Sequence, residues 1–249
     1  MAALSVNINK IALLRNSRPG NYPDIIDYAR QCIAFGAQGI TVHPRPDQRH
    51  IRAQDCLALK HTIGDVELNI EGNPMAAYMA SSREDVSDYP GFMEIIRKVR
   101  PQQATLVPDN NSQLTSDHGF DLRQPDNALQ DIISELKDLG IRVSLFLDTD
   151  CQQVALARQI GADRIEFYTG PYAHADNKKS AFADYCKAAE CALAEGLGIN
   201  AGHDLNLDNL GLFATLPGLL EVSIGHALTV DALHLGLEQT IHCYLQLLQ

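Results

Sequence analysis

Short apolar runs alternate with amphipathic segments along the whole 249-residue chain. Eight such runs, the expected strands, lie at residues 4–8, 40–42, 66–71, 104–107, 143–147, 164–168, 197–200 and 219–224. Between them, helical patterning occurs at about 24–35, 53–63, 92–99, 128–139 and 181–195, and a last helix extends to about 247. Eight strand–helix units in about 250 residues are typical of a closed (β/α)8 barrel. We therefore predict the α/β class, with a single (β/α)8 TIM barrel and extra helices over residues 1–249.

An open, doubly wound sheet is the alternative architecture. Its dinucleotide-binding form has a Gly-x-Gly-x-x-Gly turn after the first strand, where residues 7–10 of this chain read Asn-Ile-Asn-Lys. Loops are expected at 14–20 and from 169 to the helix at 181, and Asp148 or Thr149 is expected to cap the helix after strand five. Residues 74–90 break the repeat and are rich in small and acidic residues, so we expect an inserted loop or short helix there.

Polar residues occur within or just after the expected strands. Seven different strands supply Asn7, His43, Glu71, Thr105, Glu166, His203 and His226. Because the strands of a barrel are parallel, closing the sheet brings these residues to its C-terminal mouth, where barrel enzymes build their active sites. His61, His118, His234 and His242 lie away from strand ends and are expected to be hydrogen-bonded packing residues.

The residues after strand two point to an anionic ligand. His43, Arg45, Arg49 and His50 follow the strand, and Pro44 and Pro46 stiffen the loop. Two imidazoles with two guanidiniums suit a phosphorylated or carboxylated substrate that needs a proton moved.

Two glycine–histidine pairs strengthen that interpretation. Gly202-His203 follows strand seven and Gly225-His226 follows strand eight. Backbone N–H groups at these strands, with the N-terminus of the last helix behind them, commonly form the phosphate site of a barrel.

Composition restricts the partners and the compartment. A net charge of -11 disfavours nucleic acids and anionic membranes as partners. No window approaches 18 apolar residues, so neither membrane insertion nor secretion is expected. The six cysteines form no Cys-x-x-Cys pair and no metal-like cluster, so reduced thiols in a cytoplasmic protein are predicted. These cysteines are Cys32, Cys56, Cys151, Cys186, Cys191 and Cys243.

Seven segments, in order, resemble one family. They read VNINKIALLRNSR, GITVHPRPDQRHI, LNIEG, ATLVPD, IEFYTGPYA, NAGHDLN and VSIGHAL. The sequence is similar to the pyridoxine 5'-phosphate synthases of the deoxyxylulose-dependent vitamin B6 pathway. The resemblance implies a cytoplasmic (β/α)8 barrel that assembles as a homo-octamer built from dimers, without metal or organic cofactor. It also implies condensation of 3-amino-2-oxopropyl phosphate with 1-deoxy-D-xylulose 5-phosphate to pyridoxine 5'-phosphate, phosphate and water.

The resemblance also assigns roles to residues. His43 and Glu71 would accept protons, His203 would donate one, and Glu166 would stabilise the transition state. Deoxyxylulose phosphate would contact Arg45, His50 and Thr105, and the aminoketone phosphate would contact Asn7, Arg18, Gly225 and His226. Three departures from the family pattern are present: Asn9-Lys10 where Asp-His is common, Asp204 where glycine is common, and a longer segment at 74–90. Asn9, Lys10 and Asp204 are retained as candidate substrate contacts.

The residue inventory is consistent with this chemistry and leaves other functions open. Histidine and glutamate supply repeated proton transfers near neutral pH. Lys10 is the sole lysine at a strand end, which favours an imine between the two substrates over one with the protein. A sugar-phosphate aldolase or isomerase and a non-catalytic sugar-phosphate sensor remain alternatives. A metal-dependent barrel hydrolase would need a His-x-His pair on strand one, which this sequence lacks.

Overall fold

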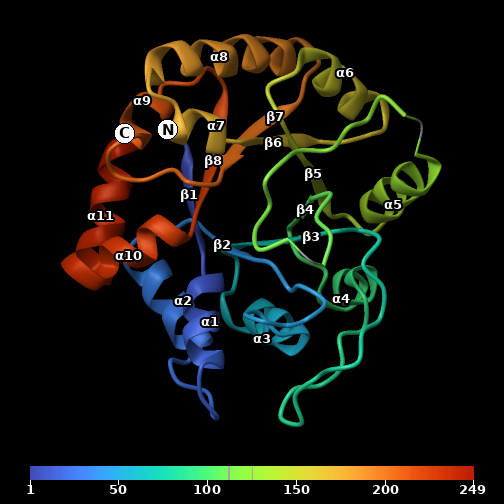
Figure 1. The fold of residues 1–249 in the computed structure, drawn as a ribbon, viewed down its shortest axis with the longest axis vertical. Coiled ribbons are helices and arrows are strands. Elements are labelled where there is room, and N and C mark those ends of the chain that lie inside the picture. The colour runs from blue at the N-terminus through green and yellow to red at the C-terminus, as the bar shows by residue number, and fades with distance from the viewer. Residues whose placement is uncertain (112, 125) are drawn as a thin grey trace.

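Eight parallel strands form a closed barrel in sequence order, which confirms the predicted fold (Figure 1). The computed structural model describes residues 1–111, 113–124 and 126–249. The strands are β1 Ala3–Asn7, β2 Gly39–Val42, β3 Glu67–Gly72, β4 Gln103–Leu106, β5 Arg142–Leu147, β6 Arg164–Tyr168, β7 Gly198–Gly202 and β8 Leu219–Ile224. Each strand pairs in parallel with the next, and β8 closes the barrel on β1.

Helices surround the barrel, as the coiled ribbons of Figure 1 show. They are α1 Asn9–Asn16, α2 Ile25–Ala34, α3 Ala53–Thr62, α4 Phe92–Val99, α5 Asn127–Asp138, α6 Cys151–Gln159, α7 Gly170–His174, α8 Lys178–Ala194, α9 Leu210–Phe213, α10 His226–Leu235 and α11 Leu237–Leu247. Three of them, α1, α7 and α9, were not predicted. The expected C-terminal helix is two helices, separated at Gly236, whose φ of 79° is left-handed.

The cap predicted for the helix after strand five was wrong. Asp150, and neither Asp148 nor Thr149, caps α6, because its side chain accepts hydrogen bonds from the backbone N–H groups of Gln152 and Gln153. Asp24 caps α2 in the same way.

Each strand has an outer apolar face and an inner polar face. Leu4 and Val6 of β1, and Leu68 and Ile70 of β3, lie in the core between the barrel and its helices. The interior instead contains hydrogen-bonded polar side chains. Ser5 and Thr41 are joined at 2.7 Å, Thr105 donates to Asn69 at 3.0 Å, and Asn200 donates across the lumen to Gln103 at 3.3 Å. Hydrogen-bonded polar side chains therefore occur inside the barrel as well as at its mouth.

Charged residues fill the N-terminal end of the barrel. Arg142 pairs with Glu67 at 2.5 Å, and Arg164 pairs with Glu221 at 3.3 Å. Burial, followed by the charges of Glu67 and Glu166, raises the pKa of Glu221 to about 8 despite Arg164. Glu221 is therefore protonated at neutral pH in the folded protein.

Residues 74–90, called the insert below, form a loop between β3 and α4. The described residues of the insert include no helix, so the expected loop is confirmed and the alternative of a short helix is wrong. An isolated antiparallel bridge joins Met79 to Tyr89. Figure 1 shows the insert as a long loop on the side of the barrel that carries α3 and α4.

One disulfide contradicts the prediction of reduced thiols. Cys151 at the start of α6 is bonded to Cys191 of α8, 40 residues later, with the two Cα atoms 5.6 Å apart. The remaining cysteines Cys32, Cys56, Cys186 and Cys243 are free thiols. The prediction failed because the pair results from the packing of α6 against α8, which no local spacing reveals.

No helix among the described residues is both long and apolar enough to cross a membrane.

The buried glutamates predict how stability depends on pH. A carboxyl group whose pKa rises on folding from 4.5 to about 8 favours the fold most below pH 4.5, and this contribution is lost as pH rises through 8. One such proton gives a slope of at most about 1.4 kcal/mol per pH unit. We expect Glu221→Gln to flatten the decline of thermal stability between pH 5.5 and 8.5, measured by melting temperature. An unchanged slope would mean that Glu221 is already ionised.

Candidate active site

A cavity of about 390 Å³ opens at the C-terminal mouth of the barrel. All but two of the residues predicted for the site line this cavity. The predicted residues that line it are Asn7, Asn9, Lys10, His43, Arg45, His50, Glu71, Glu166, His203, Asp204, Gly225 and His226. The expectation that residues from different strand ends meet at one mouth is therefore confirmed.

The first three strands place two of the predicted proton acceptors side by side. His43 Nδ1 lies 4.0 Å from Glu71 Oε2, and Asn7 Nδ2 donates to the same oxygen at 3.4 Å. Asn9 Oδ1 accepts from the backbone N–H of His43 at 3.0 Å. The Asn9 that departs from the family pattern therefore helps to fix His43.

Burial decides the protonation of this pair. Burial, followed by the nearby side chains of Arg45, His50 and Arg49, lowers the pKa of His43 well below its ordinary value. Burial, followed by the carboxyl groups of Asp109 and Glu221, raises the pKa of Glu71 to about 8. At neutral pH, His43 is therefore a neutral imidazole able to accept a proton, beside a carboxyl group that titrates close to the working range.

Glu166 lies deeper, where β6 and β7 meet. Burial and the neighbouring Glu71 raise its pKa well above the ordinary value, although Thr105 donates to its Oε2 at 3.4 Å. Gly202 makes room for the carboxyl group, because a Cβ atom at residue 202 would lie 2.3 Å from Glu166 Oε1. Glu166 therefore has a fixed position on the inner wall.

His203 and Asp204 form the opposite wall in an uncommon backbone conformation. Their φ angles are 86° and 59°, in the left-handed region that favours glycine. His203 Nδ1 lies 3.0 Å from an Asp204 carboxylate oxygen, and His203 Nε2 contacts Thr115 Oγ1 at 2.8 Å. The neighbouring His203 imidazole lowers the pKa of Asp204. A carboxylate thus lies beside the predicted proton donor.

The β2–α3 loop, residues 43–52, supplies positive charge and a defined tautomer. His50 Nδ1 accepts from the backbone N–H of Ile51 at 2.9 Å, so the proton of the neutral ring is on Nε2. Burial, with the charges of Arg45, Arg49 and Lys10, lowers the pKa of His50 to about 3. The ring is therefore a neutral hydrogen-bond donor at physiological pH.

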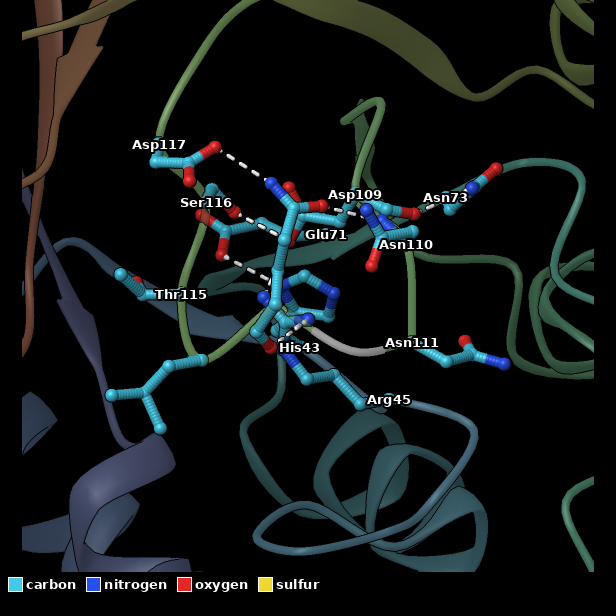
Figure 2. A network of polar contacts seen from close by, with 12 residues as sticks. His43, Arg45, Glu71, Asn73, Asp109, Asn110, Asn111, Thr115, Ser116 and Asp117 are labelled. Atoms are coloured by element: carbon cyan, nitrogen blue, oxygen red, sulfur yellow. Dashed lines mark hydrogen bonds and ion pairs between the residues drawn. The ribbon is translucent and has the colours of Figure 1, made fainter.

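Arg45 is engaged by the segment that follows β4. Its guanidinium forms a buried ion pair with Asp109 and donates to the backbone oxygen of Gln113 at 3.4 Å. Ser116 also donates to Asp109, at 2.7 Å. Figure 2 shows Arg45, Asp109 and Ser116 within a network of polar contacts. An anion that binds Arg45 must therefore share it with Asp109 or displace that carboxylate.

The strand-eight side of the cavity offers backbone donors. Helix α10 begins at His226 and has no side-chain cap, so its first N–H groups are available at the mouth. A Cβ atom on Gly225 would lie 3.0 Å from the Cβ of Asn7. The close approach of β8 to β1 therefore depends on glycine at residue 225.

Two predicted residues lie elsewhere. Arg18 is exposed beyond the end of α1, and Thr105 is buried beneath Glu166 and does not line the cavity. Thr115, Phe146 and Ser223 line the cavity and were not predicted. Arg49 also lines the cavity and was predicted only as a source of positive charge. Strand-end position could have identified Phe146 and Ser223, whereas Thr115 lies in a segment without periodicity.

Within residues 1–111, 113–124 and 126–249, no group of three or more His, Cys, Asp and Glu side chains is arranged to hold a metal ion.

Structural comparison supports the fold. The chain resembles 3-hexulose-6-phosphate synthase from Salmonella typhimurium, with a TM-score of 0.66 and 14% identity over 99% of this chain and 98% of that one. It also resembles phosphoribosyl anthranilate isomerase from Thermus thermophilus, with a TM-score of 0.57 and 13% identity over 99% of this chain and 98% of that one. At such identities the likeness concerns the fold alone.

Sequence comparison identifies the family. Residues 4–249 match the family model described as pyridoxal phosphate biosynthesis protein PdxJ. A pyridoxine 5'-phosphate synthase of Xanthomonas axonopodis pv. citri is 55% identical, over 99% of this chain and 96% of the relative. One of Porphyromonas gingivalis is 51% identical, over 98% of each. The chain therefore belongs to the PdxJ family of pyridoxine 5'-phosphate synthases, enzymes of pyridoxine biosynthesis.

Proposed function

We propose that this enzyme condenses 3-amino-2-oxopropyl phosphate with 1-deoxy-D-xylulose 5-phosphate, by proton transfers among histidine and glutamate side chains. The observation that carries the proposal is the convergence of His43, Glu71, Glu166 and His203 on one cavity. Forming the imine, eliminating phosphate and water and closing the ring need a proton to be taken or given at each step.

The acid-base groups have complementary states. His43, neutral and buried, accepts a proton from the bound substrates. Glu71, with its pKa raised to about 8, exchanges protons near neutral pH. His203, between Thr115 and Asp204, is the proton donor to the leaving hydroxyl group. Glu166, kept protonated by burial, donates a hydrogen bond to charge that develops on the substrates.

Two anion sites would bind the two phosphates. Arg45 and the Nε2–H of His50 lie on the β2–α3 loop and would bind deoxyxylulose phosphate. Asn7, Gly225 and His226 lie where β1 and β8 meet, and would bind the aminoketone phosphate with the α10 N-terminus. Lys10, in the first turn of α1, lines the cavity and adds positive charge. Asp204 would orient His203.

An assay with both substrates tests the proposal. The purified enzyme should form pyridoxine 5'-phosphate only when both are present, detected by its absorbance and mass. Conversion of either substrate alone, without the amine or without the sugar, would favour a single-substrate aldolase or isomerase. Binding without any conversion would favour a sugar-phosphate sensor.

Glu71→Gln should lower turnover by roughly 10²- to 10⁴-fold, because the amide keeps the shape but can neither release nor take up a proton. Binding of each substrate, measured by calorimetry, should change little. Glu67→Gln provides the matched control, since Glu67 lies on the same strand at the other end of the barrel, paired with Arg142. Near wild-type turnover in Glu71→Gln would remove Glu71 from the mechanism.

Arg45→Ala should raise the Michaelis constant for deoxyxylulose phosphate about tenfold or more, and raise that for the aminoketone phosphate less. A charge-assisted hydrogen bond lost from a buried site costs about 1.5 to 3 kcal/mol of binding free energy. In the wild-type enzyme part of this binding energy is offset, because the phosphate must share Arg45 with Asp109 or displace it. Arg97→Ala is the control, because Arg97 forms exposed ion pairs on α4. Equal effects on both substrates would show that Arg45 does not discriminate between the two phosphates.

We also propose a homo-octamer built from dimers, in the cytoplasm. Exposed apolar side chains support self-association: Leu14 on α1 is 56% exposed and Leu233 on α10 is 79% exposed. These two helices contact each other. Light scattering should give eight chains per particle, and Leu233→Glu should reduce that number without lowering helical content. A monomer at micromolar concentration would contradict the proposal, and cell fractionation would check the compartment.

A further inference from the structure

The insert, residues 74–90, does not line the cavity. It contacts the β2–α3 loop, residues 43–52, whose Arg45, Arg49 and His50 face the cavity. The insert is therefore placed to influence substrate binding through that loop.

The first contact is made by Gln48. Its Nε2 donates to the backbone oxygen of Ser87 in the insert at 2.6 Å, and its Oε1 accepts from the backbone N–H of Ala53, the first residue of α3, at 3.0 Å. Gln48 is buried and has a φ of 50°. A non-glycine residue in the left-handed region persists where surrounding contacts fix it. One side chain therefore joins the insert, the loop and α3.

The second contact is made through Asn16 at the end of α1. Arg83 of the insert donates to the backbone oxygen of Asn16 at 3.1 Å. The Asn16 side chain donates to the backbone oxygens of Gln48, Arg49 and His50, at 3.3, 3.1 and 2.7 Å. The insert thus binds the residue whose side chain holds the loop backbone.

A third contact is electrostatic. Asp85 of the insert pairs with Arg83 at 2.9 Å and lies 3.7 Å from Arg52. Arg52, which is buried, donates to Asn16 Oδ1 at 3.0 Å. Arg83 and Arg52 therefore approach Asn16 from two sides, with Asp85 between their positive charges.

The insert is itself ordered by internal bonds. Tyr89 is fully buried and Val86 is nearly so. Asp88 accepts hydrogen bonds from the Tyr78 hydroxyl at 2.6 Å and from the backbone N–H of Ser81 at 2.9 Å. These contacts fix the shape of the insert, which can therefore hold the β2–α3 loop in position.

We propose that the insert positions the β2–α3 loop for phosphate binding, with Gln48 and Arg83 as its positioning residues. Contacts at Gln48 and Asn16 hold the loop backbone, so Arg49 and His50 are presented to the cavity before substrate arrives. Less ordering is then needed on binding, which improves affinity. The inference rests on the proposed function, because it assigns the loop to one of the two phosphorylated substrates.

Two variants test this: Gln48→Met, which keeps the side-chain length but removes both hydrogen bonds, and Arg83→Met, which removes the contact with Asn16. Glu84→Gln is the control, because Glu84 is an exposed neighbour in the same insert. Backbone hydrogen exchange over residues 44–52 should be at least fivefold faster in both variants than in the control. The Michaelis constant for deoxyxylulose phosphate should rise about fivefold, with kcat and the constant for the aminoketone phosphate within twofold of wild type.

The measurements separate this inference from the proposed function. If the wild-type enzyme makes no pyridoxine 5'-phosphate, the proposed function fails, and hydrogen exchange together with calorimetric binding of inorganic phosphate decides the role of the insert. Unchanged exchange over 44–52 would overturn the inference, as would equal rises in both Michaelis constants. If Arg83→Met does not fold, Gln48→Met decides alone, since its substitution lies in the loop and leaves the insert sequence intact.

Discussion

The burial of carboxyl groups inside a barrel with too few neighbouring cations governs the chemistry of this site. Glu71, Glu166 and Glu221 share one polar lumen, and each raises the pKa of another. The arginines inside the barrel, Arg142 and Arg164, lie at its N-terminal end. Glu71 and Glu166, which lie nearer the mouth and away from these arginines, therefore keep their protons at neutral pH.

The loops at the mouth contribute the positive charge and the hydrogen-bond donors of the site. Arg45 could neutralise Glu71, but its ion pair with Asp109 directs its charge toward the segment after β4. His50 is kept neutral by burial and by surrounding positive charge, and serves as a donor. Positive charge thus lies mainly on the loops, whereas the carboxyl groups with a raised pKa lie on the strands. The separation gives a chain with net charge -11 positively charged side chains at its cavity.

The strands and most of the site could be predicted from the sequence because both follow from local patterns. The alternation in β3 gives its two faces, and polar residues at the ends of parallel strands gather at the mouth. Some of what failed lacked a local signal, and some depends on contacts between distant segments. Helix α1 begins without a side-chain cap, so no start signal was available. The Cys151–Cys191 bond and the Arg45–Asp109 pair join residues 40 and 64 positions apart. No spacing rule connects such pairs.

The contact between Gly202 and Glu166 limits sequence change at residue 202. A Cβ atom at residue 202 would lie 2.3 Å from Glu166 Oε1, so a side chain there requires the Glu166 carboxyl group to shift. Replacement of Glu166 by a smaller residue, in contrast, leaves Gly202 without conflict. A larger side chain at residue 202 therefore requires the Glu166 carboxyl group to leave its place between β6 and β7. The geometry couples the two positions, so a glycine on β7 accompanies the buried carboxyl group on β6.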